Sequence, residues 1–212
     1  LLQIKQAAIS EADRKKLESE AHFIRAYMYF ALAKRYGGVP IITEPQQYVP
    51  GSDNADLFIP RSTEKETWDF ILQELDLAAA NLPATLTAAD GAYRATKWTA
   101  YALASRVALH AASIAKYWSK APLTGEAVDK KLVGGMSSSD ADVYYQKCIE
   151  ASNQVITNAG KSLFRATPAN KADTSICSLA KSSRSRRIAM LSSALSCVSS
   201  SASSSSPSSS TS

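Results

Sequence analysis

Aromatic residues outside the helical patterns are the side chains of this sequence best suited to binding chemistry. Tyr48 and Tyr93 lie in segments rich in turn-forming residues, and Trp118 ends an alanine-rich stretch. An exposed ring stacks on the C–H face of a sugar, which combines apolar burial with hydrogen bonds at the polar edges. These three residues are therefore candidate glycan-stacking positions. Loop aromatics that fold back to cover a core produce the same pattern, so that interpretation stays open.

The other reactive side chains do not predict a catalytic, metal or cofactor-binding constellation. His22 and His110 are far apart, and neither has neighbours at metal-ligand spacing, so we expect structural or surface roles. The sequence contains no G-x-S-x-G, P-loop or G-x-G-x-x-G motif, and we expect a protein that is not an enzyme. Carboxylates recur along residues 64–76 on the polar side of a helical pattern, which predicts a solvated face.

The net charge of +5 is not evenly distributed along the 212 residues. Residues 1–160 carry 17 basic and 18 acidic side chains, whereas residues 161–212 carry 7 and 1. Because the excess lies in the C-terminal segment, a folded basic groove for nucleic acid is not expected. The sequence also lacks a run of about 18 apolar residues, so it predicts no membrane-spanning helix.

Four amphipathic helices are predicted by apolar residues that recur every three or four positions. They cover residues 11–36, 64–80, 97–118 and 141–158. The first helix has two apolar stripes, so we expect it to be central, with neighbours on two sides. Alanines in the third helix allow close packing, and Cys148 in the fourth is expected to be a small buried hydrophobe.

Helix boundaries are marked by capping residues. Ser10, Thr63 and Thr96 are the expected N-caps, and Glu66 completes a capping box with Thr63. The first helix stops at the sequence Gly-Gly-Val-Pro of residues 37–40, where glycine accommodates a left-handed conformation and proline prevents the helix from resuming. Residues 41–61 are interrupted by proline, glycine and asparagine, which predicts an irregular extended segment.

The C-terminal segment differs in character from the rest of the chain. Half of residues 175–212 are serine, a composition that cannot bury enough apolar area to offset chain entropy. We therefore predict a helical domain over residues 1–172 and a low-complexity, disordered tail over residues 173–212. Translation in a shifted reading frame is a second hypothesis for this tail.

Four stretches in order carry a family resemblance. They are AHFIRAYMYFALAKRYGGVPIITEP (21–45), IPRSTEKETWDFILQELDLAAANLP (59–83), YRATKWTAYALASRVALHAASIA (93–115) and YYQKCIEASNQVITNAGKSLF (144–164). Together they resemble the SusD/RagB family of bacterial outer-membrane lipoproteins that bind glycans. The resemblance implies an all-α, tetratricopeptide-like scaffold of helical pairs with irregular loops.

The resemblance also implies a function, a location and partners. Such proteins bind oligosaccharide nutrients without catalysis at the cell surface and deliver them to a TonB-dependent outer-membrane transporter. Compared with that family, the chain lacks a signal peptide, a lipid-bearing cysteine and a C-terminal half, so we expect a fragment with an uncovered apolar face. Poor solubility or dimerisation would follow. The alternative interpretation is a cytosolic tetratricopeptide-like scaffold that binds peptide segments of partner proteins.

Overall fold

The structure is a computed structural model that describes residues 1–51, 53–90, 93–118 and 120–160. The predicted tail, 173–212, lies outside the described residues. The chain divides into two compact units, Leu1–Val155 and Ile156–Ser212, and the fold below is that of the first. Described elements are α1 (Leu2–Gln6), α2 (Glu11–Tyr36), η1 (Ala55–Leu57), α3 (Glu64–Asn81), η2 (Ala88–Asp90), α4 (Lys97–Trp118), α5 (Glu126–Asp129) and α6 (Asp140–Asn158).

The four long helices confirm the sequence prediction, and no strand occurs among the described residues. The predicted caps are also in place. The Ser10 hydroxyl accepts from the N–H of Asp13, and Thr63 and Glu66 form both bonds of the capping box. The N–H of Thr99 donates to the Thr96 hydroxyl over 3.3 Å. Two short helices, α1 and α5, were not predicted, because each is too brief to show an apolar period.

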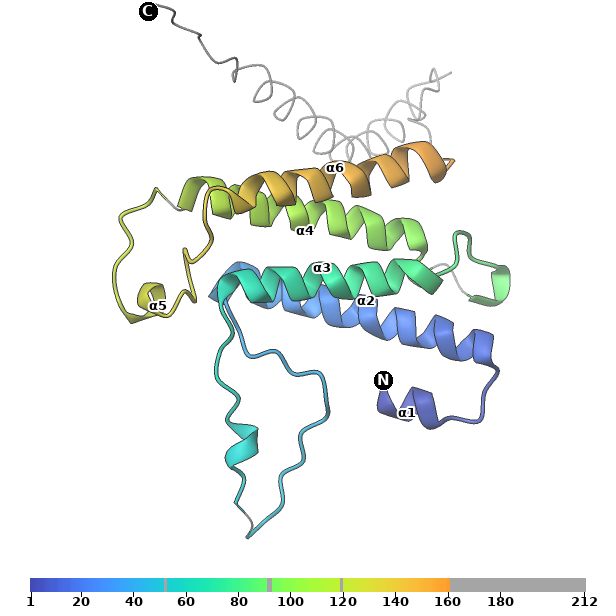
Figure 1. The fold of residues 1–212 in the computed structure, drawn as a ribbon. Coiled ribbons are helices and arrows are strands. Elements are labelled where there is room, and N and C mark those ends of the chain that lie inside the picture. The colour runs from blue at the N-terminus through green and yellow to red at the C-terminus, as the bar shows by residue number, and fades with distance from the viewer. Residues whose placement is uncertain (52, 91–92, 119, 161–212) are drawn as a thin grey trace, which may run out of the picture. The chain divides into compact units, whose positions relative to one another are not determined.

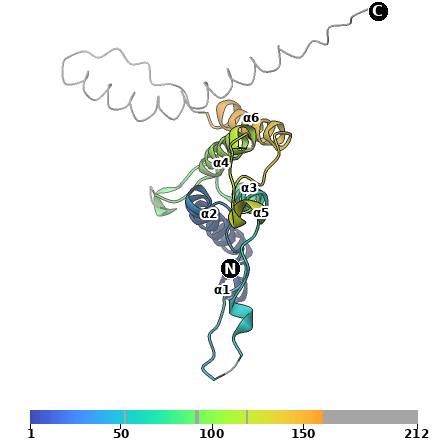
Figure 2. The same cartoon turned by 90° about the vertical axis from the view of Figure 1, so that its left-hand side faces the viewer.

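The four long helices alternate in direction along the chain, as Figure 1 shows, and Figure 2 views them nearly end-on. α2 and α3 form one antiparallel pair, α4 packs beside α3, and the part of α6 up to residue 155 lies along α4. Side-chain hydrogen bonds connect α6 to α4 and α3. The Ser105 and Ser152 hydroxyls are 2.8 Å apart, and the Tyr144 hydroxyl donates to Asp69 over 2.7 Å.

The core lies between α3 and its two neighbours. Its largest fully buried apolar side chains include Trp68, Ile71 and Leu75 of α3. α4 contributes small side chains that allow close approach of the helices, as predicted, namely Ala100, Ala104, Ala108, Ala111, Ala112 and Ala115. Cys148 is buried with a free thiol, which confirms its expected role as a small core residue.

The prediction that α2 is central is wrong for the part of the chain that the structure describes. α2 packs mainly on α3 through Ala26, Phe30 and Ala33, with only small contacts to α1 and α4. The opposite face carries an exposed apolar stripe, which comprises Ile24, Tyr27, Met28, Leu32 and Tyr36. Periodicity places a residue on a face of its helix, but whether that face is covered depends on elements elsewhere in the protein.

A buried charged cluster joins α2 to α3. The Glu74 carboxylate, 4% exposed, accepts two hydrogen bonds of 2.7 Å from the Arg25 guanidinium and lies 2.8 Å from Nδ1 of His22. The prediction of a solvated carboxylate face is therefore wrong for Glu74. Arg25 and His22, on the neighbouring helix, cover this carboxylate, and a single helical pattern does not show which side its neighbour will occupy.

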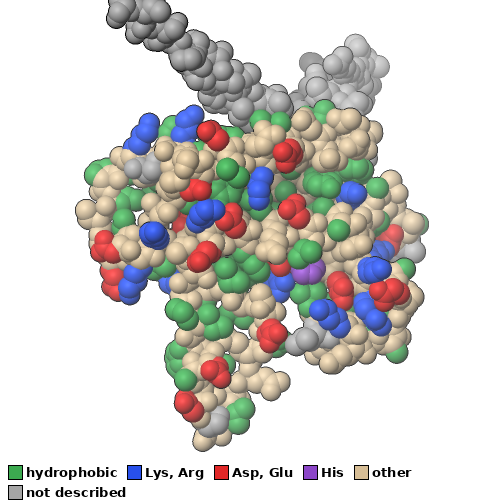
Figure 3. Space-filling view, viewed as in Figure 1, with side chains coloured by type: hydrophobic (Ala, Val, Ile, Leu, Met, Phe, Trp, Pro, Cys, Tyr) green, Lys and Arg blue, Asp and Glu red, His purple; other side chains and the backbone are tan. Residues whose placement is uncertain are grey.

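The segment between α2 and α3 projects away from the helices, as Figure 1 shows. It is irregular and extended apart from η1, as predicted. Tyr29 of α2 anchors its start, since the Tyr29 hydroxyl donates to the Pro40 carbonyl and accepts from the N–H of Ile42. Hydrophobic side chains are exposed along the projection (Figure 3), including Tyr48 and Phe58. In the described part of the chain, no helix is both long and apolar enough to cross a bilayer.

Candidate functional site

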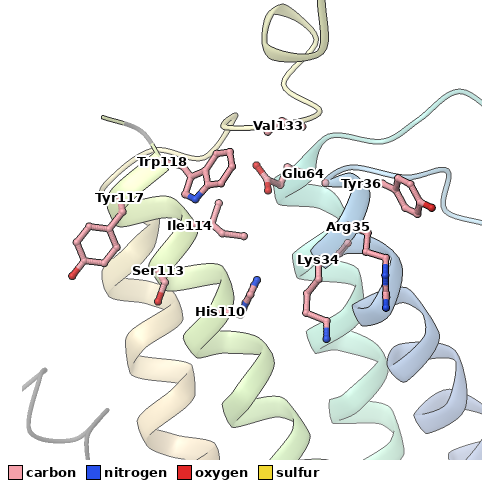
Figure 4. A pocket seen from close by; sticks show the side chains of 12 residues that line it. Lys34, Arg35, Tyr36, Glu64, His110, Ser113, Ile114, Tyr117, Trp118 and Val133 are labelled. Carbon is pink, nitrogen blue, oxygen red and sulfur yellow. The ribbon is translucent and has the colours of Figure 1, made fainter. Parts of the chain in front are cut away.

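A cavity of about 420 Å³ opens where α2 and α4 end and α3 begins (Figure 4). Its volume is within the range of small-molecule sites. The lining residues come from α2, α3 and α4, from the turn at Gly37 and from the loop that contains Val133. They are Ala33, Lys34, Arg35, Tyr36, Gly37, Glu64, His110, Ser113, Ile114, Tyr117, Trp118 and Val133.

A junction of three backbone segments builds the floor of this cavity. The N–H of Gly38 donates to the Leu132 carbonyl over 2.8 Å, and the N–H of Glu64 donates to the Lys131 carbonyl over 2.9 Å. Arg61 holds the same turn by donating to the carbonyls of Gly38 and Tyr36. The C-terminal end of α2, the start of α3 and residues 131–134 are thereby fixed relative to one another.

Both glycines of the turn are required by close approach of backbone. A Cβ on Gly37 would lie 2.2 Å from the Leu132 carbonyl oxygen, and one on Gly38 would lie 2.1 Å from that of Ser62. Gly37 also has a φ of 71°, as expected of a helix-ending glycine, but its ψ of −130° places it outside the predicted left-handed helical region. The turn is thus specified by long-range packing as well as by helix termination.

Glu64 contributes the only carboxylate among the residues that line the cavity. It is the first residue of α3, and its Oε2 accepts a 2.7 Å hydrogen bond from the N–H of Gly134. Burial raises the pKa of this carboxyl, and the bond from Gly134 opposes the rise. The predicted solvated face is therefore wrong for Glu64 as well, because the loop after α5 folds over the start of α3.

His110 lies on the opposite wall, on α4. Its ring packs on Trp68 and edge-on against Phe30, with centroid distances of 5.4 and 6.0 Å. Partial burial lowers the pKa of the imidazole, and the nearby cations Lys34 and Arg106 lower it further. The neutral ring presents one nitrogen donor and one acceptor at neutral pH.

Two cations from the last turn of α2 complete the polar lining. The Lys34 ammonium lies 4.3 Å from the centroid of the Phe30 ring, and Arg35 donates to the Ala31 carbonyl. Figure 4 shows Lys34 on the same side of the opening as His110, whereas Glu64 faces Trp118. Tyr36 and Tyr117 point away from the opening in the same view.

The three predicted stacking residues are not brought together. Trp118 lines the cavity and is 47% exposed. Tyr93 is completely exposed and precedes the start of α4, whereas Trp118 ends that helix, so about 33 Å of helix separates them. Tyr48 is 70% exposed in the projecting segment. None of the three rings is packed into the core, so the folding-back interpretation does not apply to them.

Sequence reasoning missed Glu64, His110 and Lys34 as partners of Trp118. Glu64 was assigned to a solvated face, His110 to a structural or surface role and Lys34 to no role, and no spacing in the sequence links the three. The available signal was indirect. The Gly-Gly-Val-Pro turn and the cap at Thr63 mark two helix ends, and helix ends that meet in an antiparallel pair enclose polar groups. Among the described residues, no group of His, Cys, Asp or Glu is arranged to hold a metal ion.

Comparisons with known proteins agree with one another. A family model for SusD-like proteins, described as starch-binding and associating with the outer membrane, matches residues 1–109. A SusD-like protein of Bacteroides ovatus is 32% identical over 104 residues, which cover 49% of this chain and 17% of that protein. The crystal structure of a SusD-like protein from Bacteroides fragilis aligns at 32% identity with a TM-score of 0.53, covering 75% of this chain and 24% of that one.

Two further solved structures share the fold. A laminarin-binding SusD-like protein aligns with a TM-score of 0.54 at 19% identity, over 77% of this chain and 29% of its own. A protein solved with a xylogluco-oligosaccharide aligns with a TM-score of 0.54 at 21% identity, over 76% and 27%. These alignments confirm the all-α, tetratricopeptide-like scaffold of helical pairs. The chain spans less than a third of the length of each of these four relatives.

Proposed function

Because this chain belongs to the SusD-like family, we propose that it captures oligosaccharides at the bacterial outer membrane without transforming them. The family description and the carbohydrate ligands named for two relatives of the same fold support this function. We extend the proposal to delivery of the glycan to a TonB-dependent transporter and to a position on the cell surface, both of which the family resemblance implies.

The cavity is the proposed site of capture. The observation that supports this most is the partly exposed Trp118 ring in its lining. The indole faces the Glu64 carboxylate across the opening (Figure 4), which pairs a stacking surface with a hydrogen-bond acceptor. Burial of such a ring contributes about 1.5–3 kcal/mol, and a hydrogen bond to a charged group contributes about as much. Micromolar affinity corresponds to about −8 kcal/mol, so additional sugar contacts are needed. Tyr48 and Tyr93 are proposed as separate stacking positions for a longer glycan.

The chemistry of the lining favours binding over hydrolysis. Glycoside hydrolases generally place two carboxyl groups on either side of the bond that is cleaved. Glu64 has no second carboxylate opposite it among the lining residues, where Trp118 and His110 lie instead. This arrangement supports the proposed binding function.

The proposal is tested by affinity gel electrophoresis of the full chain in gels that contain starch, laminarin or xyloglucan. We expect at least one glycan to slow migration and Trp118→Ala to reduce that effect most, with smaller effects of Tyr48→Ala and Tyr93→Ala. Phe58→Ala is the matched control, since its ring is 83% exposed on the projecting segment, away from the cavity.

Two results would count against the proposal in different ways. Unchanged migration of all three variants in every retarding gel would exclude these rings as stacking positions. If no glycan slows the unmodified chain, glycan capture itself is contradicted. A peptide array then tests the peptide-binding scaffold, which is the alternative that the sequence left open.

A further inference from the structure

The cations at the cavity, like Arg61 and Lys97 elsewhere in the described chain, are not paired with carboxylates. Elsewhere, several lysine and arginine side chains meet carboxylates, as in the pairs Lys16–Asp90, Arg25–Glu74, Lys65–Asp69, Arg94–Glu20 and Lys130–Glu126. Lys34 contacts an aromatic ring, and Arg35 donates to a backbone carbonyl. Neither forms an ion pair with any residue that the structure describes. Lys34 lies nearer to His110, whereas the Arg35 side chain runs back along α2 beyond Lys34 (Figure 4), and neither charge has an anionic partner within the cavity.

The single carboxylate of the lining does not neutralise these cations. Glu64 is buried, already bonded to the N–H of Gly134, and lies near Trp118, whereas Lys34 lies near His110 (Figure 4). Arg106 precedes His110 by one turn of α4, so a third cation stands close to that side of the opening. The lining thus has an aromatic and acceptor end and a cationic end.

These two ends match one chemical class of sugar. A pyranose ring stacked on Trp118 would offer hydroxyl groups to Glu64, since carboxylates accept hydrogen bonds from hydroxyls. A negatively charged substituent on the same or the next sugar would meet Lys34 and Arg35, which bind carboxylate and sulfate oxygens through charge-assisted hydrogen bonds. A neutral sugar would leave both cations without an anionic partner.

We infer that the cavity prefers acidic saccharides, whose negative charge is a uronate carboxylate or a sulfate ester, over their neutral counterparts. The inference rests on the proposed glycan capture and specifies the ligand class of that same site. Lys34 and Arg35 are then specificity-determining residues, and Trp118 supports acidic and neutral sugars alike.

The test measures affinities of the full chain by titration calorimetry for matched pairs of oligosaccharides. One set pairs oligogalacturonides and alginate oligosaccharides with their carboxyl-reduced forms, and the other pairs sulfated carrageenan oligosaccharides with their desulfated forms. We expect the acidic member of at least one pair to bind about three- to tenfold more tightly, as for one or two partly exposed ion pairs. The set in which this ratio appears identifies the anionic group. The ratio should fall as salt is raised from about 50 to about 500 mM, because screening weakens exposed charge pairs.

Variants locate the effect at the cavity. In Lys34→Gln/Arg35→Gln the affinity ratio should fall toward one, whereas Lys34→Arg should keep it because the charge is retained. Lys15→Gln is the matched control for Lys34→Gln alone, since each removes one charge and Lys15 lies toward the other end of α2, about 28 Å from Lys34. Thermal melting of each variant establishes that the fold is intact.

The outcomes separate this inference from the function on which it rests. Equal affinity within every pair, together with measurable neutral binding, overturns the acidic preference and leaves glycan capture standing. A ratio that Lys15→Gln lowers as much as Lys34→Gln also overturns it, because the effect would then arise from overall charge. Absence of binding to every saccharide, including those of the gel panel, contradicts glycan capture itself.

Discussion

Replacement of Gly38 by alanine should be among the most damaging small substitutions in this chain. The new Cβ would lie 2.1 Å from the Ser62 carbonyl oxygen, 2.8 Å from the Thr63 carbonyl carbon and 2.9 Å from the Glu64 nitrogen. All three are backbone atoms, so no side chain can rotate away. Gly38 does not have a positive φ, so the cost is steric and not conformational.

The magnitude follows from the bonds that the displaced backbone would lose. Separating the segments by about 1 Å breaks or weakens the bond from Gly38 N–H to the Leu132 carbonyl and the bond from Ser62 N–H to the Val39 carbonyl. At about 1 kcal/mol each, with about 1–3 kcal/mol for overpacking, the free energy of unfolding should fall by about 3–5 kcal/mol.

The assay is urea unfolding followed by far-UV circular dichroism, with Gly51→Ala as the matched control. Gly51 has a φ of 81°, and a Cβ added there would meet no atom within 4 Å, so its substitution should cost only about 1 kcal/mol of backbone strain. If Gly38→Ala costs no more than Gly51→Ala, the junction is not tightly packed and the account of the cavity floor fails.

Four further predictions concern other parts of the fold. Thr63→Ala should lower the free energy of unfolding by about 1 kcal/mol in urea titrations, because it removes the capping box of α3, and no change would contradict that role. Glu74→Ala should cost about 3–5 kcal/mol by the same assay, because it leaves the Arg25 charge partly buried without its partner; a cost below 1 kcal/mol would refute this. Burial raises the pKa of Glu64, so its contribution to stability is present below pH 4.5 and is lost as pH rises through the raised pKa. Relative to the unmodified chain, Glu64→Gln should therefore gain stability as pH rises above 4.5, whereas a pH-independent difference would contradict the assignment. Met28→Lys should reduce concentration-dependent association measured by light scattering, since Met28 lies in the exposed apolar stripe of α2. Unchanged association would show that another surface mediates it.

Local signals in the sequence were sufficient to predict the helices. The caps at Ser10 and Thr63 and the stop at Gly37 depend on residues within one turn, and the structure places the helix ends there. Apolar periodicity also identified the buried face of α3, which packs on both sides. These features are predictable because each is determined by contacts between residues that are close in sequence.

Whether a given helix face is buried by another element was not predictable in the same way. The stripe that contains Ile24 and Met28 has the pattern of a core, yet it is exposed in the described residues. Glu64 and Glu74 have the pattern of a solvated face, yet both are buried. In each case the deciding atoms belong to another element, such as Gly134 for Glu64, and one sequence without an alignment does not reveal that pairing.

The candidate site shows the same division. Trp118 was identifiable because an aromatic ring at a helix end needs no other residue to be recognised. Its partners come from α2, α3 and α4, and only the meeting of three helix ends makes them a site. Lys34 in particular gives no sequence signal beyond a basic residue in the last turn of a helix, which is common.

Residues 131–134 hold the turn after α2 in place, and this affects the order in which the chain folds during synthesis. Leu132, which accepts the Gly38 hydrogen bond, is synthesised about 5–20 s after Gly38 at usual translation rates. During that interval α2 and α3 can already pair through their shared apolar contacts, but the Gly38 N–H has not yet formed its hydrogen bond to the Leu132 carbonyl. A nascent polypeptide arrested before Leu132 would therefore carry both helices on the ribosome, but the turn after α2 would lack its hydrogen bond to Leu132 and the cavity would be incomplete.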